Sequence, residues 1–329
     1  MADNELATRA PESDAKEDVV LHEEPVTSAG EPSAAAQPRM SDHCTSDRPS
    51  PAGQQPTGEL TKLNDIDVYI AKPTDYPHSP SKLLLLLTGG TGLHSTNNQL
   101  QADAFASSGF LVVMPDQFSN DPAPNAVDMS TISENTSWLE SVKLKTAEAA
   151  KAFMIDMWLA RHTPEKVLPI LRKVVDGAKE EFADAVANGG GIYGVGYCFG
   201  AKYILHLAGE NADSDALVEV KDEEQGPVKK EPVIKAAAVA HGTMVTKEDV
   251  EAVRSPTYIA AVENDPLFSE EEVLTPGRRA LEEKNVEHEV QVFSGVPHGF
   301  AVLGDYEDAA IQQKQKEAYE KMLGWLQAH

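Results

Sequence analysis

The chain has 329 residues, of which 41% are hydrophobic, and it carries a formal charge of −25 at pH 7. This length allows one large domain or two modest ones. Acidity of this strength excludes nucleic acid and anionic membranes as partners held by bulk charge. No apolar run approaches the roughly 18 residues that span a bilayer. The acidic N-terminus has neither the apolar core of a signal peptide nor the composition of a transit peptide, so we expect a cytoplasmic protein.

Residues 1–56 differ in composition from the rest of the chain. They are rich in Ala, Pro, Ser and acidic side chains, and they show no hydrophobic periodicity. Such a composition buries too little apolar surface to offset the entropy lost on ordering. We therefore expect a disordered acidic tail over residues 1–56, followed by one domain over residues 57–329.

Short apolar strands and helical stretches alternate through this domain. We expect strands at residues 67–70, 83–87, 110–114, 192–195, 236–240, 257–261 and 289–293, and helices at residues 99–107, 198–207 and 308–327. Continuous apolar strands separated by helices are typical of a parallel sheet that is buried on both faces. The predicted fold class is α/β, with a mostly parallel central sheet and helices on both faces.

Two stretches interrupt the alternation. Residues 119–190 open with a loop-forming sequence and then contain several helical runs, which is more than one crossover connection needs. We expect a helical insertion there, part of which could form a lid. Residues 209–232 are rich in charged side chains, and we expect them to form an exposed surface insertion.

The most informative motif is an apolar strand that runs into Gly196-Tyr197-Cys198-Phe199-Gly200 and then into a helix. In the nucleophile elbow of α/β-hydrolases, the nucleophile occupies a strained strand-to-helix turn between small neighbours. Cys198 holds that place, at a helix N-terminus where the local field favours a thiolate. The plainer alternative is a small, inert packing residue. The only other cysteine is Cys44, so a disulfide framework or a four-thiolate zinc site is excluded.

Two later loops supply the partners that a cysteine nucleophile needs. Asp265 and His298 each follow an expected strand, in the order nucleophile, acid and base that this elbow requires. The carboxyl ends of parallel strands meet at one edge of the sheet, where open α/β proteins keep their sites. We predict that His298 is the base and that Asp265 orients it, with Glu263 as a substitute acid. The alternatives are a turn-capping carboxylate and a structural histidine.

The sequence resembles the dienelactone hydrolases, especially their fungal members, over about residues 57–329. The resemblance rests on residues 196–200, 263–265 and 298–300, and on residues 97–103 leading to 113–116. It implies an α/β-hydrolase fold and a Cys-His-Asp hydrolase of small esters or lactones that forms a thioacyl-enzyme. It also implies that no metal and no organic cofactor take part. We expect a monomer or homodimer whose partner is a small-molecule substrate, without nucleic acid or membrane.

Backbone and aromatic groups complete the predicted site. The oxyanion is expected to lie between the N–H groups of Phe199 and Gly90, the latter in the Gly-rich loop at residues 88–92. That loop lacks the Gly-Lys-Ser/Thr ending of a P-loop, which argues against nucleotide binding. The expected substrate-pocket residues are Tyr197, Phe300 and His241. For His241, a hydrogen bond within its own loop is the alternative.

Two departures from bacterial relatives bear on the substrate. Those relatives place a glutamate where this chain has Gly89, and an arginine a few residues after the histidine to hold a substrate carboxylate. Here residues 300–303 read Phe-Ala-Val-Leu and offer no cation. A neutral or hydrophobic ester is therefore the expected substrate.

Alternative functions fit the same residues. Acyl transfer to an acceptor other than water, or thioester cleavage, would use the same nucleophile and base. A catalytically idle hydrolase fold could instead serve as a binding protein, with the acidic tail and residues 209–232 as contact surfaces. Redox sensing through Cys198 is a further alternative.

Overall fold

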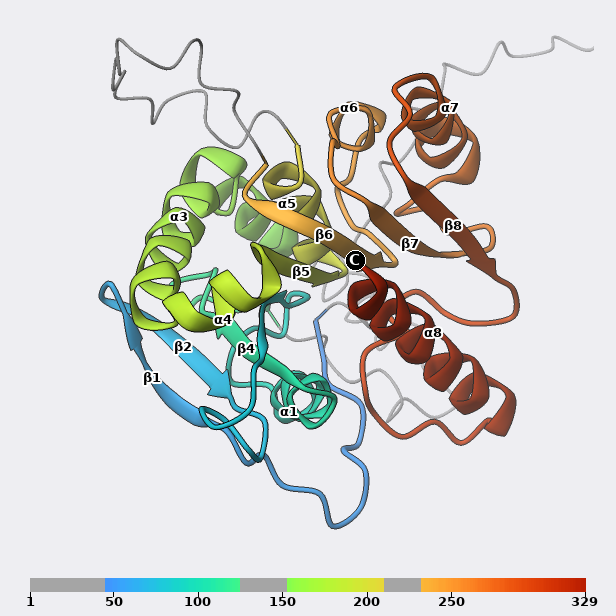
Figure 1. The fold of residues 1–329 in the computed structure, drawn as a ribbon. Coiled ribbons are helices and arrows are strands. Elements are labelled where there is room, and N and C mark those ends of the chain that lie inside the picture. The colour runs from blue at the N-terminus through green and yellow to red at the C-terminus, as the bar shows by residue number, and fades with distance from the viewer. Residues whose placement is uncertain (1–44, 125–152, 210–231) are drawn as a thin grey trace, which may run out of the picture. The chain divides into compact units, whose positions relative to one another are not determined.

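The computed structural model describes residues 45–124, 153–209 and 232–329, and it is built on one eight-stranded sheet (Figure 1). The strands are β1 Glu59–Leu63, β2 Ile66–Ala71, β3 Lys82–Leu87, β4 Phe110–Pro115, β5 Ile192–Tyr197, β6 Ile234–Ala240, β7 Thr257–Val262 and β8 His288–Phe293. They lie in the order β1-β2-β4-β3-β5-β6-β7-β8. β2 pairs antiparallel with β1 and β4, and every other neighbouring pair is parallel.

The apolar sequence of the central strands explains their position inside the molecule. β4, β5 and β7 are buried at every residue, because helices cover both faces of the sheet. All seven strands expected from the sequence are present. β1 is an addition that the apolar pattern did not indicate, since four of its five residues are exposed. It forms an edge hairpin with β2 through Asn64 and Asp65, whose φ angles of 46° and 66° suit a tight turn.

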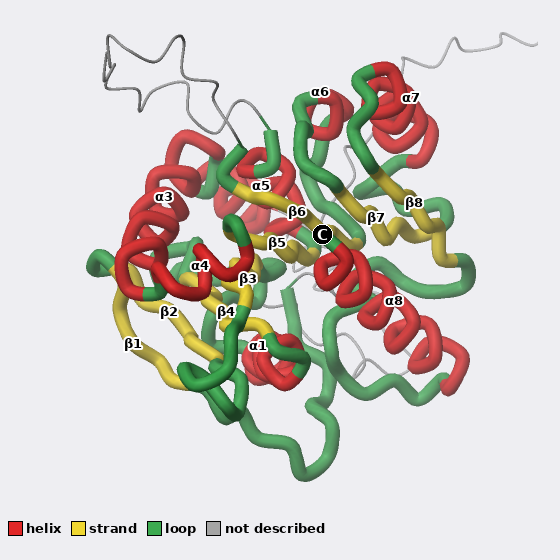
Figure 2. Tube along the Cα trace, in the orientation of Figure 1, coloured by secondary structure: helices red, strands yellow, loops and turns green. Residues whose placement is uncertain are grey.

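Helices pack on both faces of the sheet (Figures 1 and 2). α1 Thr96–Ser107 and α8 Ala309–Ala328 share one hydrophobic cluster with one face of the strands. α3 Pro164–Glu181, α4 Ala183–Gly189, α5 Phe199–Leu207, α6 Lys247–Glu251 and α7 Thr275–Glu283 share the cluster on the other face, and the π-helical η4 Glu270–Leu274 precedes α7. The predicted α/β-hydrolase architecture is therefore confirmed. Within the three described ranges, no helix has both the length and the apolar character of a membrane span.

The stretch expected to be a helical insertion, residues 119–190, is described at 119–124 and from residue 153 onward. α3 buries Val167, Leu171 and Val174 in the core, so this helix covers the sheet. Within the described part of the insertion, α3 thus packs on β1, β2 and β4, and α4 packs on β3 and β5. Residues 125–152 lie outside the described ranges, as do residues 210–231, which include nearly all of the insertion expected at 209–232.

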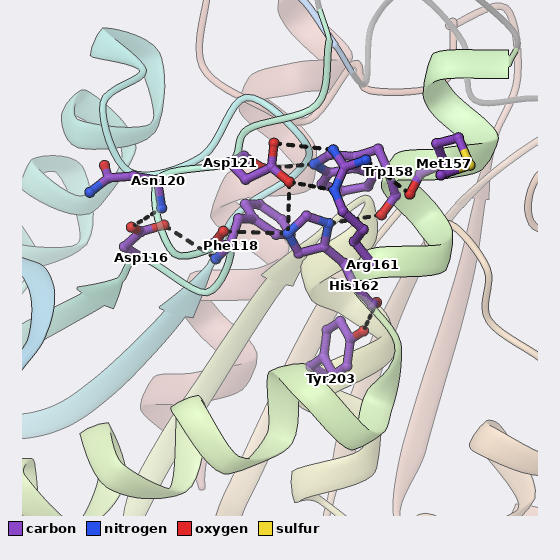
Figure 3. Close-up of polar contacts among 9 residues, drawn as sticks. All are labelled: Asp116, Phe118, Asn120, Asp121, Met157, Trp158, Arg161, His162 and Tyr203. Atoms are coloured by element: carbon purple, nitrogen blue, oxygen red, sulfur yellow. Dashed lines mark hydrogen bonds and ion pairs between the residues drawn. The ribbon is translucent and has the colours of Figure 1, made fainter.

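A helix at residues 153–161 is attached to the loop that follows β4 (Figure 3). Trp158 Nε1 donates to the Asp121 carbonyl at 2.7 Å, and Arg161 Nε pairs with the Asp121 carboxylate at 2.9 Å. The Trp158 ring also packs against Phe118 and Phe199, with centroid distances of 5.0 and 4.9 Å. Because Phe199 directly follows Cys198, this aromatic cluster supports the predicted elbow from the α5 side.

Candidate active site

β5 ends at Tyr197 and α5 begins at Phe199, so Cys198 forms the turn between them. Its backbone takes φ 51° and ψ −114°, a conformation that costs energy for a residue with a side chain. A Cβ on Gly196 would lie 2.7 Å from the Gly200 carbonyl oxygen, and a Cβ on Gly200 would collide with the β3 backbone. The two glycines are therefore required for the close approach of α5 to the sheet.

His298 and Asp265 meet between the loops that follow β8 and β7. His298 Nδ1 lies 2.6 Å from Asp265 Oδ2, and the two side chains are only 6% and 0% exposed. The second carboxylate oxygen accepts the Leu267 backbone N–H at 2.9 Å, which fixes the carboxylate in place. Glu263, the substitute acid, is exposed to solvent. The geometry therefore selects Asp265 as the partner of the histidine.

A threonine that the sequence analysis did not single out lies between the thiol and the imidazole. Thr243 Oγ1 is 3.1 Å from Cys198 Sγ and 3.0 Å from His298 Nε2, and the residue is completely buried. Its backbone N–H donates to the Cys198 carbonyl at 3.0 Å. Cys198, Thr243, His298 and Asp265 thus form one continuous series of polar contacts. The sequence signal that could have identified Thr243 is its position. It stands on the loop after β6, two residues after His241.

A buried charge network holds the loop at residues 241–246 from its far side. Lys202 Nζ donates to the Met244 carbonyl at 2.8 Å and to Asp249 Oδ2 at 2.7 Å. His206 Nε2 lies 2.9 Å from Asp249 Oδ1. Burial alone would raise the pKa of Asp249, but the hydrogen bond with His206 and the charge of Lys202 outweigh burial and lower the pKa to about 2. Asp249 is therefore ionised at neutral pH and anchors Lys202 and His206 beneath the loop.

The Gly-rich loop after β3 lies directly beside the elbow. A Cβ on Gly89 would be 3.2 Å from Cys198 Cβ and 3.6 Å from its Sγ. The side-chain amide of Asn98 donates to two oxygen atoms of this loop, and Ala123 N donates to the Gly90 carbonyl at 2.8 Å. The loop backbone that carries the expected oxyanion donor of Gly90 is thus fixed from two directions.

The aromatic residues expected in the pocket occupy two layers. His241 lines the pocket, and its ring centroid is 5.1 Å from that of His298. Tyr197 and Phe300 lie behind His241, at centroid distances of 6.0 and 6.1 Å, in the hydrophobic cluster under α1 and α8. Burial raises the pKa of the Tyr197 hydroxyl well above its ordinary value. These two rings therefore support His241 from the core side.

Buried polar residues of α1 connect several parts of the site. Asn97 Nδ2 donates to the Arg48 carbonyl at 2.9 Å, and Gln101 Oε1 accepts the Leu303 N–H at 2.9 Å. Together with Asn98, which holds the Gly-rich loop, these residues are buried although they are polar. Their hydrogen bonds tie three separate segments to one helix. This explains why a polar run occupies the inner face of α1.

A small pocket lies beside Cys198, with a solvent-accessible volume of about 20 Å³. The domain lines it with Gly89, Thr91, Asn97, Asn98, Cys198, His241, Gly299, Val302 and Leu303, and the N-terminal segment lines it with Ser46, Asp47 and Arg48. Such a volume is close to that of a single water molecule. We call residues 45–49 the N-terminal strap, because three of them line this pocket.

The strap brings a cation that the sequence analysis placed in the disordered tail. The guanidinium carbon of Arg48 lies 3.7 Å from the centre of the Tyr306 ring, a cation–π contact. Asp47 Oδ1 accepts a hydrogen bond from Ser95 Oγ at 2.7 Å. Residues 300–303 provide no cation, as expected, but Arg48 reaches the same pocket from the other end of the chain.

Comparison with known proteins agrees with the fold. The family model of the dienelactone hydrolase family matches residues 66–220 and 226–329. The hydrolase pyvD of Aspergillus violaceofuscus is 29% identical, over 82% of this chain and 89% of its own. Dienlactone hydrolase 1 of Gibberella moniliformis is 26% identical, over 83% of this chain and 88% of its own. Among solved structures, a candidate dienelactone hydrolase from Klebsiella pneumoniae shares the fold, with a TM-score of 0.56 and 16% identity over 83% of this chain and 99% of that chain.

Proposed function

Because the chain belongs to the dienelactone hydrolase family, and is thus a carboxylic ester hydrolase, we propose that it cleaves small esters or lactones through an acyl-thioester on Cys198. The observation that carries this proposal is the continuous polar series from Cys198 Sγ through Thr243 and His298 to Asp265, at the carboxyl ends of parallel strands. A nucleophile, a base and an orienting carboxylate within hydrogen-bond reach are the minimum for acyl transfer.

In the first half of the reaction, the thiol proton moves toward His298 and Cys198 Sγ attacks the substrate carbonyl. The negative charge on the carbonyl oxygen is stabilised by the backbone N–H groups of Phe199 and Gly90. Collapse of the tetrahedral intermediate breaks the ester C–O bond, and His298 returns the proton to the departing alcohol oxygen. In a lactone, this alcohol stays attached to the acyl group.

In the second half, a water molecule gives a proton to His298 and attacks the thioester carbonyl. The C–S bond then breaks, the carboxylic acid leaves, and Cys198 recovers its proton. Asp265 accepts the Nδ1–H of His298 throughout, so Nε2 faces the reaction and the imidazolium is stabilised when it forms. No step requires a group beyond these residues, the substrate and water.

The test is hydrolysis of p-nitrophenyl acetate, with intact-protein mass spectrometry of the acylated chain. Wild type and Cys44→Ala, which alters the other cysteine, should turn over the ester and stop after treatment with iodoacetamide. Cys198→Ala should fold, as circular dichroism would show, but retain less than a few per cent of the turnover and form no acyl adduct. Turnover by Cys198→Ala close to that of wild type would exclude the thiol as nucleophile.

A further inference from the structure

The hydroxyl group of Thr243 touches both groups between which the proposed reaction moves a proton. A threonine hydroxyl carries one proton to donate and lone pairs that accept. It can therefore accept from the Cys198 thiol at 3.1 Å while it donates to His298 Nε2 at 3.0 Å. Both distances are in the range of ordinary hydrogen bonds, given the larger radius of sulfur. This alternation of donor and acceptor is what a proton relay needs.

We propose that Thr243 is a catalytic residue that relays the proton of Cys198 to His298, which extends the proposed hydrolase function and rests on it. Before transfer, the thiol S–H donates to Thr243 Oγ1 and the Oγ1–H donates to His298 Nε2. In the transfer, the S–H bond breaks as a new O–H bond forms, and the old O–H bond breaks as the N–H bond forms. The products are a thiolate, an intact threonine hydroxyl and an imidazolium, so atoms and charge balance.

The backbone around Thr243 holds this hydroxyl in place at some energetic cost. His241 and Met244 both have positive φ angles, 38° and 59°, which are unfavourable for residues with side chains. Such strain persists where surrounding contacts impose it, and it concentrates at functional sites. Here the imposing contacts are the Thr243 N–H to the Cys198 carbonyl and Lys202 Nζ to the Met244 carbonyl. A loop that served only to connect β6 with α6 would not need this arrangement.

The hydroxyl is also neutral, whereas a negative charge at this place would oppose formation of the thiolate. Cys198, Thr243 and His298 are 2%, 0% and 8% exposed, so water contributes little screening around them. A buried carboxylate at position 243 would hold the proton on itself and oppose formation of the thiolate. A hydroxyl passes the proton on without changing its own charge.

Alkylation of Cys198 by iodoacetamide tests the relay without any ester, because the thiolate is the species that reacts. The rate would be measured between pH 5 and 10, by mass spectrometry of the peptide that contains Cys198. In Thr243→Val, which keeps the shape of the side chain, we expect alkylation at neutral pH to slow about tenfold or more, and its half-maximal pH to move upward. Thr243→Ser, which keeps the hydroxyl, should stay within about threefold of wild type.

A matched control is Thr257→Val, which removes another fully buried threonine hydroxyl, one that donates to the Ser255 carbonyl away from the thiol. It should alter stability but leave the alkylation profile unchanged. If Thr243→Val does not fold, Thr243→Ala supplies the same measurement. Wild-type alkylation by the folded Val or Ala variant would overturn the relay. Equal slowing in the Ser variant would also overturn it, because the hydroxyl would then not be the active group.

A second experiment distinguishes the relay from a simple hydrogen bond between the Thr243 hydroxyl and the thiolate. In a His298→Ala background there is no imidazole to receive the proton, so the relay predicts that Thr243→Val has little further effect. An undiminished effect in that background would contradict the relay. The relay and the hydrolase function can fail independently. An alkylation profile that depends on Thr243, in a chain that hydrolyses no ester, would refute the proposed function and leave the relay standing.

Discussion

Two sides of the same pocket are built in different ways. Cys198 and His241 stand where strands of the sheet end, whereas residues 45–49, on the opposite side, belong to no helix or strand. On the sheet side, backbone hydrogen bonds join each of these two residues to the neighbouring strand. Cys198 N donates to the Ala240 carbonyl at 3.1 Å, and His241 N donates to the Ala260 carbonyl at 2.8 Å. The groups proposed for the chemistry are therefore part of the sheet framework.

The strap side is held by α1, by its N-cap Ser95 and by the loop before α8. Pro49 O accepts the Asp305 N–H at 2.9 Å, Arg48 O accepts from the Asn97 side chain at 2.9 Å, and Asp47 Oδ1 accepts from Ser95 Oγ at 2.7 Å. Segments with few buried contacts open at the lowest free-energy cost. A pocket of about 20 Å³ is far smaller than the several hundred Å³ typical of small-molecule sites. From this difference we expect a substrate to displace the strap, while the sheet side stays fixed for the chemistry.

The largest expected effect comes from removing the carboxylate of Asp265, on the sheet side of the pocket. Asp265→Asn keeps the shape of the side chain but favours the wrong tautomer of His298 and removes the charge that stabilises its imidazolium. We expect kcat for p-nitrophenyl acetate to fall by about 10²–10⁴-fold. Glu263→Gln, two residues away and exposed, is the matched control and should leave kcat for the same ester nearly unchanged. A comparable loss in both variants would show that general charge, rather than the bond to His298, is responsible.

Acid should weaken the support beneath the loop at residues 241–246. The folded-state pKa of Asp249 is about 2, below its ordinary value of 3.8, so its contribution to stability is fully present above about pH 4 and is lost as the pH falls through 2. The size of that contribution is about 2 kcal/mol. Urea unfolding between pH 5 and 2 should show a steeper loss of stability in wild type than in Asp249→Asn.

The control for this measurement is Glu283→Gln, which removes an exposed acid on α7. It should follow the wild-type dependence on pH. If Asp249→Asn and wild type lost stability in parallel over this range, the low pKa of Asp249 would not contribute to folding.

Local signals explain how much of the site the sequence could predict. The place of Cys198 in the turn could be predicted because an elbow requires small residues on both sides, and Gly196 and Gly200 stand close to it in the sequence. Asp265 and His298 were found because each follows an apolar strand, and parallel strands bring their carboxyl ends together. The structure places these two side chains 2.6 Å apart. The fold followed from the same apolar strands.

Thr243 and Arg48 carried no comparable signal. The role of a threonine hydroxyl depends on its distances to Cys198 and His298, which lie far away in the sequence, and threonine itself is common in loops. Arg48 stands in a run of polar residues that resembles a disordered tail. Its place depends on a contact with Tyr306, at the far end of the chain. Composition cannot reveal a segment held by a few long-range contacts.

Removing the strap should have a moderate effect on the reaction. A chain that begins at Pro51 lacks the strap, so its pocket is open to larger substrates. We expect kcat/KM for a long-chain p-nitrophenyl ester to rise about tenfold relative to that for the acetate, because displacement of the strap no longer opposes binding. A chain that begins at Ser41 keeps the strap and should behave like the full chain. Equal selectivity in both truncated chains would mean that the strap does not restrict the pocket.

The smallest expected effect concerns the charge of the substrate. Arg48 lines the pocket and stacks its guanidinium on Tyr306, so we expect a substrate carboxylate on that side to find a cation that residues 300–303 do not supply. Because Arg48 is partly exposed, the interaction is screened and worth only about 0.5–1 kcal/mol. Arg48→Gln should therefore lower kcat/KM for an ester with a free carboxylate about threefold more than for its methyl ester. The gap should narrow at high salt, because screening weakens attraction at partly exposed sites.

Arg278→Gln, which removes a guanidinium paired with Glu282 on α7, is the control for net charge. A loss that is the same for both substrates, or the same in both variants, would leave Arg48 as a residue that only attaches the strap to Tyr306.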